Sequence, residues 1–186
     1  MIVIGITGTI GAGKGTIVDY LVEKFGFTHY SVRSFLIEEA QKRELPLNRD
    51  TYVELANSLR AQHCPSYITD QLYEQAMNQG TSAVIESLRT PGEIESLRKN
   101  KQFYLLAVDA LPELRYERIV LRNSETDQIS FQTFVENEAR EMNSEDPNKQ
   151  NLKKCIQMAD FVLKNDQTIQ DLYQQLDQVI AQIVPK

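Results

Sequence analysis

A glycine-rich segment near the start of the chain has the residue types that bind phosphate. It reads GTIGAGKGT, and its glycines, lysine and threonine are Gly8, Gly11, Gly13, Lys14, Gly15 and Thr16. Glycines let successive backbone N–H groups turn towards an anion without a Cβ in the way, and a helix N-terminus adds partial positive charge. Lys14 can then reach the β and γ phosphates of a nucleotide. The segment therefore predicts an ATP-binding loop in which Lys14 is catalytic.

The position after the lysine departs from the strict phosphate-loop pattern. That pattern has Ser or Thr directly after the lysine, whereas Gly15 stands there and Thr16 follows one place later. A glycine supplies no hydroxyl group to a metal ion. We therefore expect Mg²⁺ to be held by nucleotide phosphates and waters.

Three arginines further along the chain have helical spacing. Arg115, Arg118 and Arg122 lie at positions i, i+3 and i+7, which places them on one face of a helix. Such a face suits a ligand with several negative charges. Alternatively, Glu113 and Glu117 pair with these arginines on a solvated helix surface.

Other arginines lie in the first helical insertion and after the third apolar run. Arg33, Arg43 and Arg60 belong to a long helical stretch after the second apolar run, and Arg89 follows Glu86 by three residues. A phosphate acceptor is already a good nucleophile, so it needs arginine clamps more than it needs a base. We expect these arginines to bind the acceptor. The alternatives are exposed surface charges and a simple pair between Glu86 and Arg89.

The order of strand-like and helical patterns indicates an α/β fold. Short apolar runs predict strands over 1–7, 28–32, 82–86, 102–109 and 160–163. A helix follows the glycine loop and stops at Gly26, and helical spacing predicts further helices over 34–43, 50–62, 67–78, 91–99, 112–122, 130–142, 147–158 and 168–183. Strands that alternate with helices predict a parallel sheet, here with two helical insertions.

Composition favours one globular domain over residues 1–186. With 20 Lys plus Arg and 26 Asp plus Glu, the net charge is −6, which argues against a broad nucleic-acid surface. No apolar run approaches the roughly 20 residues that span a membrane. Cys64 and Cys155 are too few and too far apart for a disulfide framework or a zinc site. We expect a soluble, cytoplasmic protein with no membrane or nucleic-acid partner, and the oligomeric state stays open.

Several segments resemble known kinase families. The sequence GKGT resembles nucleoside monophosphate kinases of the adenylate kinase type, and IGITGTIGAGK is similar to the opening of dephospho-CoA kinases. A closer resemblance is to the kinase-like domain that precedes the zinc deaminase in some dCMP deaminase-type proteins. It is carried by HYSVRSFLIEEAQKR, ANSLRAQHCPSYI, VIESLRTPGEIESLR, AVDALPELRYERIVLR and DPNKQNLKKCIQMADFVLKND. The chain has no zinc deaminase motif, because neither histidine has Glu two residues later and PCxxC is absent.

The resemblance implies a fold and its division. It implies a three-layer P-loop kinase with a five-stranded parallel sheet in the order 2-3-1-4-5. Residues 33–80 would form the acceptor-binding insertion and residues 123–158 the lid region.

The resemblance also implies roles for individual residues. Glu86 would act on Mg²⁺ through water, and Arg89 would grip the acceptor phosphate. Arg118 and Arg122 would be catalytic lid arginines that neutralise charge during transfer. Asn165, in ADFVLKND, would help to recognise the adenine. The chain departs from adenylate kinases at Ile37, where an arginine is expected.

We expect a phosphotransferase that moves the γ-phosphoryl group of ATP to a ribo- or deoxynucleoside monophosphate, with Mg²⁺. Two alternatives stay open. One is a dephospho-CoA kinase, although that family has an Asp base after the second strand where this chain has Ser31, Val32 and Arg33. The other is a nucleotide-sensing regulatory module with little or no turnover.

Overall fold

The fold is built on a five-stranded parallel sheet. A computed structural model of the chain describes residues 1–122 and 128–184. The strands are β1 (Val3–Gly8), β2 (Thr28–Ser31), β3 (Ala83–Glu86), β4 (Phe103–Asp109) and β5 (Phe161–Lys164). Each neighbouring pair is parallel, and the order across the sheet is β2-β3-β1-β4-β5. The predicted fold class and strand order are confirmed.

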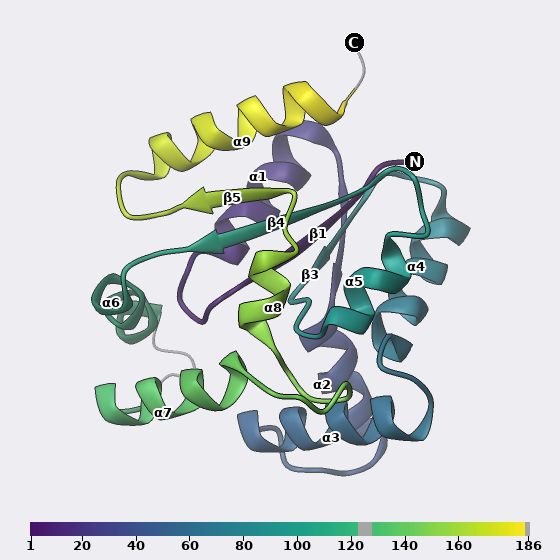
Figure 1. Cartoon of the computed structure of the whole chain (residues 1–186), viewed down its shortest axis with the longest axis vertical. Coiled ribbons are helices and arrows are strands. Elements are labelled where there is room, and N and C mark those ends of the chain that lie inside the picture. Colours follow the sequence, from purple (N-terminus) through teal and green to yellow (C-terminus); the bar gives the residue numbers. More distant parts are fainter. Residues whose placement is uncertain (123–127, 185–186) are drawn as a thin grey trace.

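Helices cover both faces of this sheet and its C-terminal end. They are α1 (Lys14–Phe25), α2 (Val32–Lys42), α3 (Arg49–Gln62), α4 (Tyr67–Gln79), α5 (Pro91–Leu97), α6 (Pro112–Arg122), α7 (Phe131–Met142), α8 (Leu152–Gln157) and α9 (Ile169–Ile183). In Figure 1, α1 and α9 lie on one side of the sheet, and α4, α5 and α8 lie on the other. The remaining helices, α2, α3, α6 and α7, gather at the end where the strands finish.

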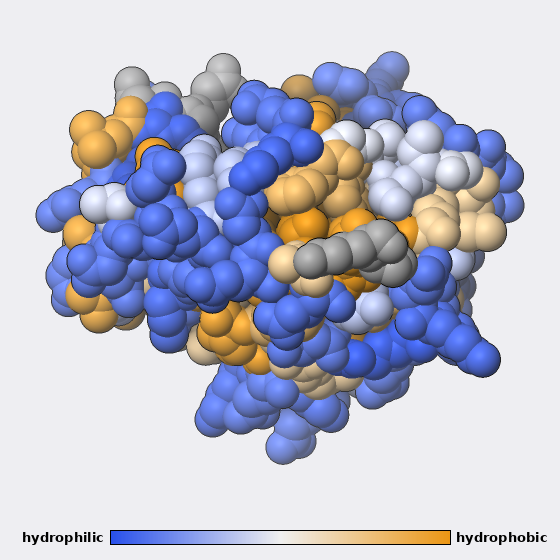
Figure 2. Space-filling model, turned by 90° about the horizontal axis from the view of Figure 1, so that it is seen from above, coloured by the Kyte–Doolittle hydropathy of each residue, from blue (hydrophilic) through white to orange (hydrophobic). Residues whose placement is uncertain are grey.

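Apolar residues form two main cores, one on each face of the sheet. One packs β1 and β3 against α2, α3, α4, α5 and α8, and the other packs the sheet against α1 and α9. All of β1 is buried, as its continuous apolar run predicts. Seen from the side of α9, the surface is mostly hydrophilic with an apolar area near its middle (Figure 2). The cores hold the sheet rigid beneath the ends of its strands.

The helix boundaries follow local capping chemistry. The helix α9 begins with the capping pair that the sequence predicts, Thr168 with Asp171. The helix α8 begins at Leu152, later than the predicted start at residue 147, because the Asn151 side chain caps it by accepting from the Lys154 N–H at 3.0 Å. The sequence analysis missed this later cap.

The fold places the candidate residues at one end of the sheet. The strands β1, β3 and β4 finish at Gly8, Glu86 and Asp109, and the loops after them face the same way. Of the predicted lid region 123–158, residues 123–127 lie outside the described part of the chain. The rest contains α7 and α8. No helix in the described ranges is long and apolar enough to cross a membrane.

Candidate active site

The glycine loop has the backbone conformation that its sequence predicts. Gly8, Gly11 and Gly13 have φ angles of 143°, 77° and 102°, which residues with a side chain rarely adopt. A Cβ on Gly11 would lie 2.4 Å from the Arg115 carbonyl oxygen, and one on Gly13 would lie 2.3 Å from Asn165 Nδ2. Gly15 differs, because nothing lies within 4 Å of a Cβ placed there. The loop is therefore shaped by backbone and close packing up to Gly13, and it is open at Gly15.

Lys14 extends across the loop at the start of α1. Its Nζ donates to the carbonyl oxygens of Gly8 at 3.0 Å and Thr9 at 2.8 Å. Burial, together with the nearby Arg89 charge, lowers the pKa of Lys14 to about 8. Phosphate oxygens would favour the charged form of this ammonium group, as the predicted role of Lys14 requires.

The Asn165 side chain supports the loop from behind. Its Nδ2 donates to the Ala12 carbonyl oxygen at 2.9 Å, and the residue is buried. This bond holds the side-chain amide of Asn165 against the glycine loop. In the described structure Asn165 therefore supports the loop. Recognition of the adenine by Asn165 stays a prediction.

The three arginines of α6 do not act as one face towards a ligand. Arg118 Nη2 donates to the Asn165 carbonyl oxygen at 2.8 Å, and Arg118 does not line the cleft described below. Arg115 is buried and donates to the carbonyl oxygens of Ala110 at 2.8 Å and Ile10 at 3.2 Å, and also to Glu138. Arg115 therefore ties the glycine loop to α6 and α7, a role that helical spacing alone did not reveal. Of the three, Arg122 lines the cleft.

Glu86 stands at the end of β3 beside the glycine loop. Its carboxylate accepts from the Ser87 hydroxyl at 3.1 Å and lies 3.5 Å from His29 Nε2. Burial alone would raise the pKa of Glu86, but His29 and Lys14 hold it below its ordinary value. Ser87 has a φ of 75°, a strained conformation for a residue with a side chain. No local sequence pattern indicates the contact with His29.

These residues fit a largely hydrated Mg²⁺. The described residues contain no group of three or more His, Cys, Asp or Glu side chains that could hold a metal. A magnesium ion that keeps several waters and binds nucleotide phosphates needs one nearby carboxylate, and Glu86 is ionised and borders the cleft. The site therefore suits a metal that arrives with a nucleotide.

One cleft extends from the glycine loop to the helices α2 and α3. Loop and strand-end residues that line it are Ile10, Gly11, Lys14, Glu86, Ser87 and Arg89. Residues from α2 and α3 are Val32, Arg33, Leu36, Arg49, Tyr52, Val53, Ala56 and Arg60. Arg122, Glu141 and Gln150 complete the lining. Among these residues six side chains are positive and two are negative, although the whole chain carries a net charge of −6.

Arg60 and Arg89, both predicted to bind the acceptor, are held by one buried carboxylate. Glu93 Oε1 accepts from Arg60 Nε at 3.2 Å and Nη2 at 2.7 Å. Its Oε2 accepts from the backbone N–H groups of Arg89 at 2.7 Å and Thr90 at 3.0 Å. Arg60 is 1% exposed, and its Nη1 has no hydrogen-bond partner among the described residues. Arg60 is therefore no surface charge, and Glu93 fixes two arginines of the cleft at once.

A second glutamate, from α7, lies within the cleft itself. Glu141 accepts from Arg49 Nη2 through Oε1 and from Arg89 Nη1 through Oε2. Burial alone would raise the pKa of Glu141, but Arg89 and Arg49 hold it below its ordinary value. Arg89 also donates to Gln150 at 3.0 Å. Sequence reasoning missed Arg49, Glu93 and Glu141, because no local pattern links residues so far apart.

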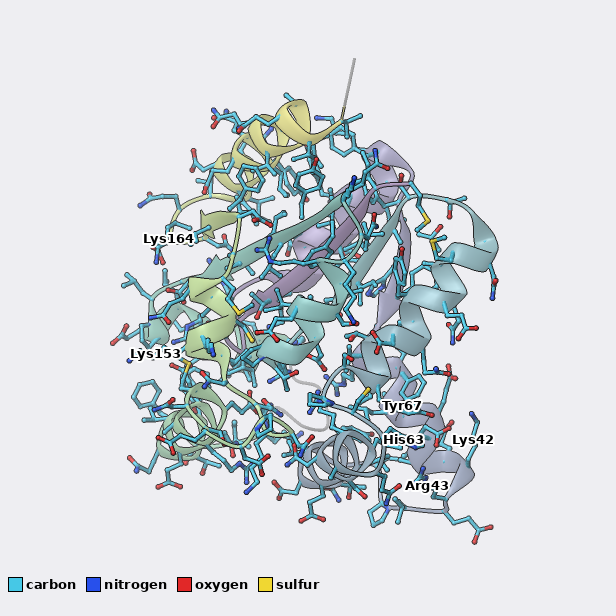
Figure 3. All side chains as sticks on the ribbon, turned by 45° about the vertical axis from the view of Figure 1, so that its right-hand side comes forward. Lys42, Arg43, His63, Tyr67, Lys153 and Lys164 are labelled. Carbon is cyan, nitrogen blue, oxygen red and sulfur yellow. The ribbon has the colours of Figure 1, made fainter. Side chains whose placement is uncertain are left out.

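Other charged and aromatic side chains lie away from the cleft. Figure 3 shows His63 beside Tyr67, and their rings stack with centroids 4.0 Å apart. Lys42 and Arg43 pair with Glu39 on α2, and Lys164 pairs with Asp109 at the end of β5. None of these residues lines the cleft. The predicted residues that do line it are Gly11, Lys14, Arg33, Arg60, Glu86, Arg89 and Arg122.

Comparison with known families fits this geometry. A family model described as an AAA domain, AAA_18, matches residues 4–146. The chain belongs to the AAA_18 family. The matched range contains the glycine loop, the acceptor-side helices and α7, so family membership covers most of the cleft.

Similarity to other proteins extends along the whole chain. A UPF0200 protein of Methanocaldococcus jannaschii, MJ1399, is 29% identical over 192 residues, covering 99% of this chain and 91% of that relative. The crystal structure of TT1252 from Thermus thermophilus has a TM-score of 0.64 at 21% identity, covering 99% of this chain and 98% of the other. A gluconokinase from Sinorhizobium meliloti has a TM-score of 0.58 at 12% identity, covering 97% and 92%. These structures share a P-loop kinase-like fold with this chain.

Proposed function

We propose that the protein is an ATP-dependent phosphotransferase that moves the γ-phosphoryl group to a ribo- or deoxynucleoside monophosphate. The observation that carries the proposal is that one cleft is lined both by Lys14 of the glycine loop and by Arg33, Arg60, Arg89 and Arg122. Such a cleft can bring two anionic substrates together and neutralise the charge of both.

The glycine loop would bind the triphosphate of ATP. Backbone N–H groups of the loop and Lys14 Nζ would contact the β and γ phosphates. Mg²⁺ would supply further charge neutralisation on these phosphates, with Glu86 near it through water. Asn165 and Arg115 would keep the loop in shape, because both bind its carbonyl oxygens.

The acceptor would lie between α2, α3 and the loop after β3. Arg60 and Arg89 would hold its phosphate, and the apolar wall from Val32, Leu36 and Tyr52 would contact its base. This combination of arginines and apolar side chains suits a nucleotide better than a small sugar acid. Arg33 borders the same region and would contact the acceptor.

Transfer itself needs positioning and charge neutralisation. An oxygen of the acceptor phosphate attacks the γ-phosphorus, the bond to the β–γ bridging oxygen breaks, and ADP leaves with the electron pair. Lys14 and Arg122 would stabilise the negative charge on the moving group. The acceptor phosphate carries no proton that must be removed, so the scheme needs no base.

Two other functions compete with this one. A dephospho-CoA kinase, or a kinase for a small sugar acid such as the similar gluconokinase, would transfer the phosphoryl group to a hydroxyl group. A nucleotide-sensing module would bind ATP in the same loop without an acceptor. The departures from the kinase families on the acceptor side, such as Ile37 in place of an arginine, motivate this last alternative.

An ADP-release assay with a panel of acceptors separates the three functions. The panel would contain ATP, Mg²⁺, all ribo- and deoxynucleoside monophosphates, dephospho-CoA and gluconate. We expect at least one nucleoside monophosphate to accelerate ADP release well above the basal rate. Acceleration by dephospho-CoA or gluconate alone would replace the acceptor class, and no acceleration despite tight ATP binding by calorimetry would favour the sensor.

A further inference from the structure

The two buried glutamates of the acceptor side stand in different places relative to its arginines. Glu93 is fully buried, does not line the cleft, and holds Arg60 and the Arg89 backbone from behind. Glu141 lines the cleft and bridges the guanidinium groups of Arg49 and Arg89 from the front. An orienting partner belongs behind the group that it orients. Glu141 occupies the side from which a ligand arrives.

The bridge at Glu141 has the geometry of a bound anion. Each carboxylate oxygen accepts from one guanidinium group, one from Arg49 and the other from Arg89. Two oxygens of a phosphate can make the same pair of contacts. Among the described residues the Arg49 side chain makes no other hydrogen bond, and its buried Nε has no partner. Arg49 therefore keeps capacity for a ligand with more oxygens than a carboxylate has.

The helix that carries Glu141, α7, is attached by a small apolar cluster and by charged groups. Its Phe134 packs against Ile10 and Ile119, outside the two main cores. Phe134 and Glu141 are its buried residues. Beyond Glu141, Glu138 pairs with Arg115 and Arg140 pairs with Asp50. Arg140 and Asp50 are both exposed, and an exposed ion pair of this kind contributes little to stability. The helix α7 can therefore release Glu141 while the sheet and its cores stay intact.

Charge favours the exchange of Glu141 for a phosphate group. A phosphate monoester carries close to two negative charges at neutral pH, whereas the carboxylate carries one. Among the described residues that line the cleft, six side chains are positive and two, those of Glu86 and Glu141, are negative. Removing one carboxylate and admitting a dianion increases the attraction between the cleft and its contents.

We propose that Glu141 is an internal occupant of the acceptor-phosphate site, and that a phosphate monoester binds Arg49 and Arg89 by displacing its carboxylate. The inference rests on the proposed function for the identity of the ligand. It adds Arg49 as a phosphate-binding residue and α7 as a self-closing element. Arg60 Nη1, unpartnered among the described residues and next to the same space, is available as a third contact. The acceptor must therefore compete with a side chain of the enzyme.

The test measures binding of inorganic phosphate, with the glycine loop saturated by a non-hydrolysable ATP analogue and Mg²⁺. Titration calorimetry compares the wild type with Glu141→Gln, which removes the charge and keeps the size. We expect Glu141→Gln to bind phosphate about tenfold more tightly, and Arg49→Gln to bind it at least tenfold more weakly. The matched control is Glu136→Gln, an exposed carboxylate of the same helix that should change nothing.

The sign of the change decides the outcome. Weaker or unchanged phosphate binding in Glu141→Gln would overturn the inference, since an orienting role predicts weaker binding. Equal thermal melting temperatures of the variants would show that folding is not the cause. No turnover enters this measurement. If Glu141→Gln binds phosphate more tightly but the protein transfers no phosphoryl group, the proposed function alone is contradicted. If the protein phosphorylates a nucleotide but Glu141→Gln does not bind phosphate more tightly, this inference alone is contradicted.

Discussion

The nucleotide side and the acceptor side of the cleft are built in different ways. The nucleotide side is a backbone structure, in which positive φ angles at Gly8, Gly11 and Gly13 set the loop. The acceptor side is a set of long arginine side chains from separate elements, of which Arg60 and the Arg89 backbone are positioned by the buried carboxylate of Glu93. Consecutive residues determine the shape of a backbone site, whereas a side-chain site depends on tertiary contacts. Variants of the two sides should therefore fail differently.

The largest effect is expected where the two sides meet. Replacing Arg122 by Ala removes a guanidinium group near the moving phosphoryl group, and kcat should fall by up to roughly 10³- to 10⁵-fold, the range of arginine fingers. ATP affinity should change little. Steady-state kinetics with calorimetry of ATP binding check this. Arg43→Ala, on a residue paired with Glu39 outside the cleft, is the control that should keep kcat. An unchanged kcat in Arg122→Ala would remove this residue from catalysis.

The next effect concerns the carboxylate that holds the acceptor side. In Glu93→Gln the buried Arg60 loses its charged partner, and breaking such a pair costs about 3 to 5 kcal/mol of unfolding free energy. Urea unfolding measures the loss. The acceptor KM should rise while ATP affinity stays close to that of the wild type. Glu95→Gln, an exposed neighbour, should leave both quantities unchanged. A loss below about 1 kcal/mol would mean that the pair is not a structural support.

A smaller effect is expected on the nucleotide side, where proton uptake on ATP binding should depend on pH. Lys14 has a pKa of about 8, and ATP phosphates should raise it. At pH 7 the free side chain is already mostly charged, so Lys14 takes up almost no proton when ATP binds there. At pH 9 it is mostly neutral, so binding should take up close to one proton and ATP affinity should be lower. Calorimetry in buffers with different ionisation enthalpies measures the uptake.

The lysine variant is the control for this proton. In Lys14→Ala the uptake at pH 9 should vanish, and kcat/KM should fall about 100-fold, because charged hydrogen bonds contribute about 1.5 to 3 kcal/mol each. Wild-type activity in Lys14→Ala, or proton uptake that persists in it, would contradict the assignment of the loop.

The smallest effect concerns the glycine that departs from the usual pattern. Gly15 is exposed and has room for a side chain, so Gly15→Ser should fold normally. Its hydroxyl could reach Mg²⁺ directly, and the Mg²⁺ concentration for half-maximal rate should fall a few-fold, in line with about 0.5 to 1.5 kcal/mol for one contact. Gly15→Ala, without the hydroxyl, is the control. Equal Mg²⁺ dependence in both variants would mean that residue 15 lies away from the metal.

The sequence predicts the nucleotide side far better than the acceptor side, for physical reasons. Strand, glycines, Lys14 and helix start are adjacent in the chain, and their order fixes the loop and the sheet around it. The role of Arg89 is predicted from its position in the sequence, three residues after Glu86. Glu93 could be recognised only as part of a helix cap, because it lies in a capping box with Thr90. Its bond to Arg60, thirty-three residues away, needs the packed helices α3 and α5.

Two further residues show the limit of sequence patterns. Arg115 and Arg118 share a helical face with Arg122, yet they bind the glycine loop and the loop after β5. Equal spacing places side chains on one face, but the neighbours of that face change along the helix. Arg49 and Glu141 are ninety-two residues apart, and no local spacing connects them. The acceptor chemistry therefore emerges only in the folded structure.

Detection of the transferred phosphoryl group tests the central claim most directly. ATP labelled in its γ-phosphate would be incubated with the protein, Mg²⁺ and each nucleoside monophosphate, and mass spectrometry would identify the labelled product. We expect label in a nucleoside diphosphate with the wild type, and none there in Lys14→Ala or Arg122→Ala. Label found only in inorganic phosphate, with every monophosphate returned unchanged, would contradict it.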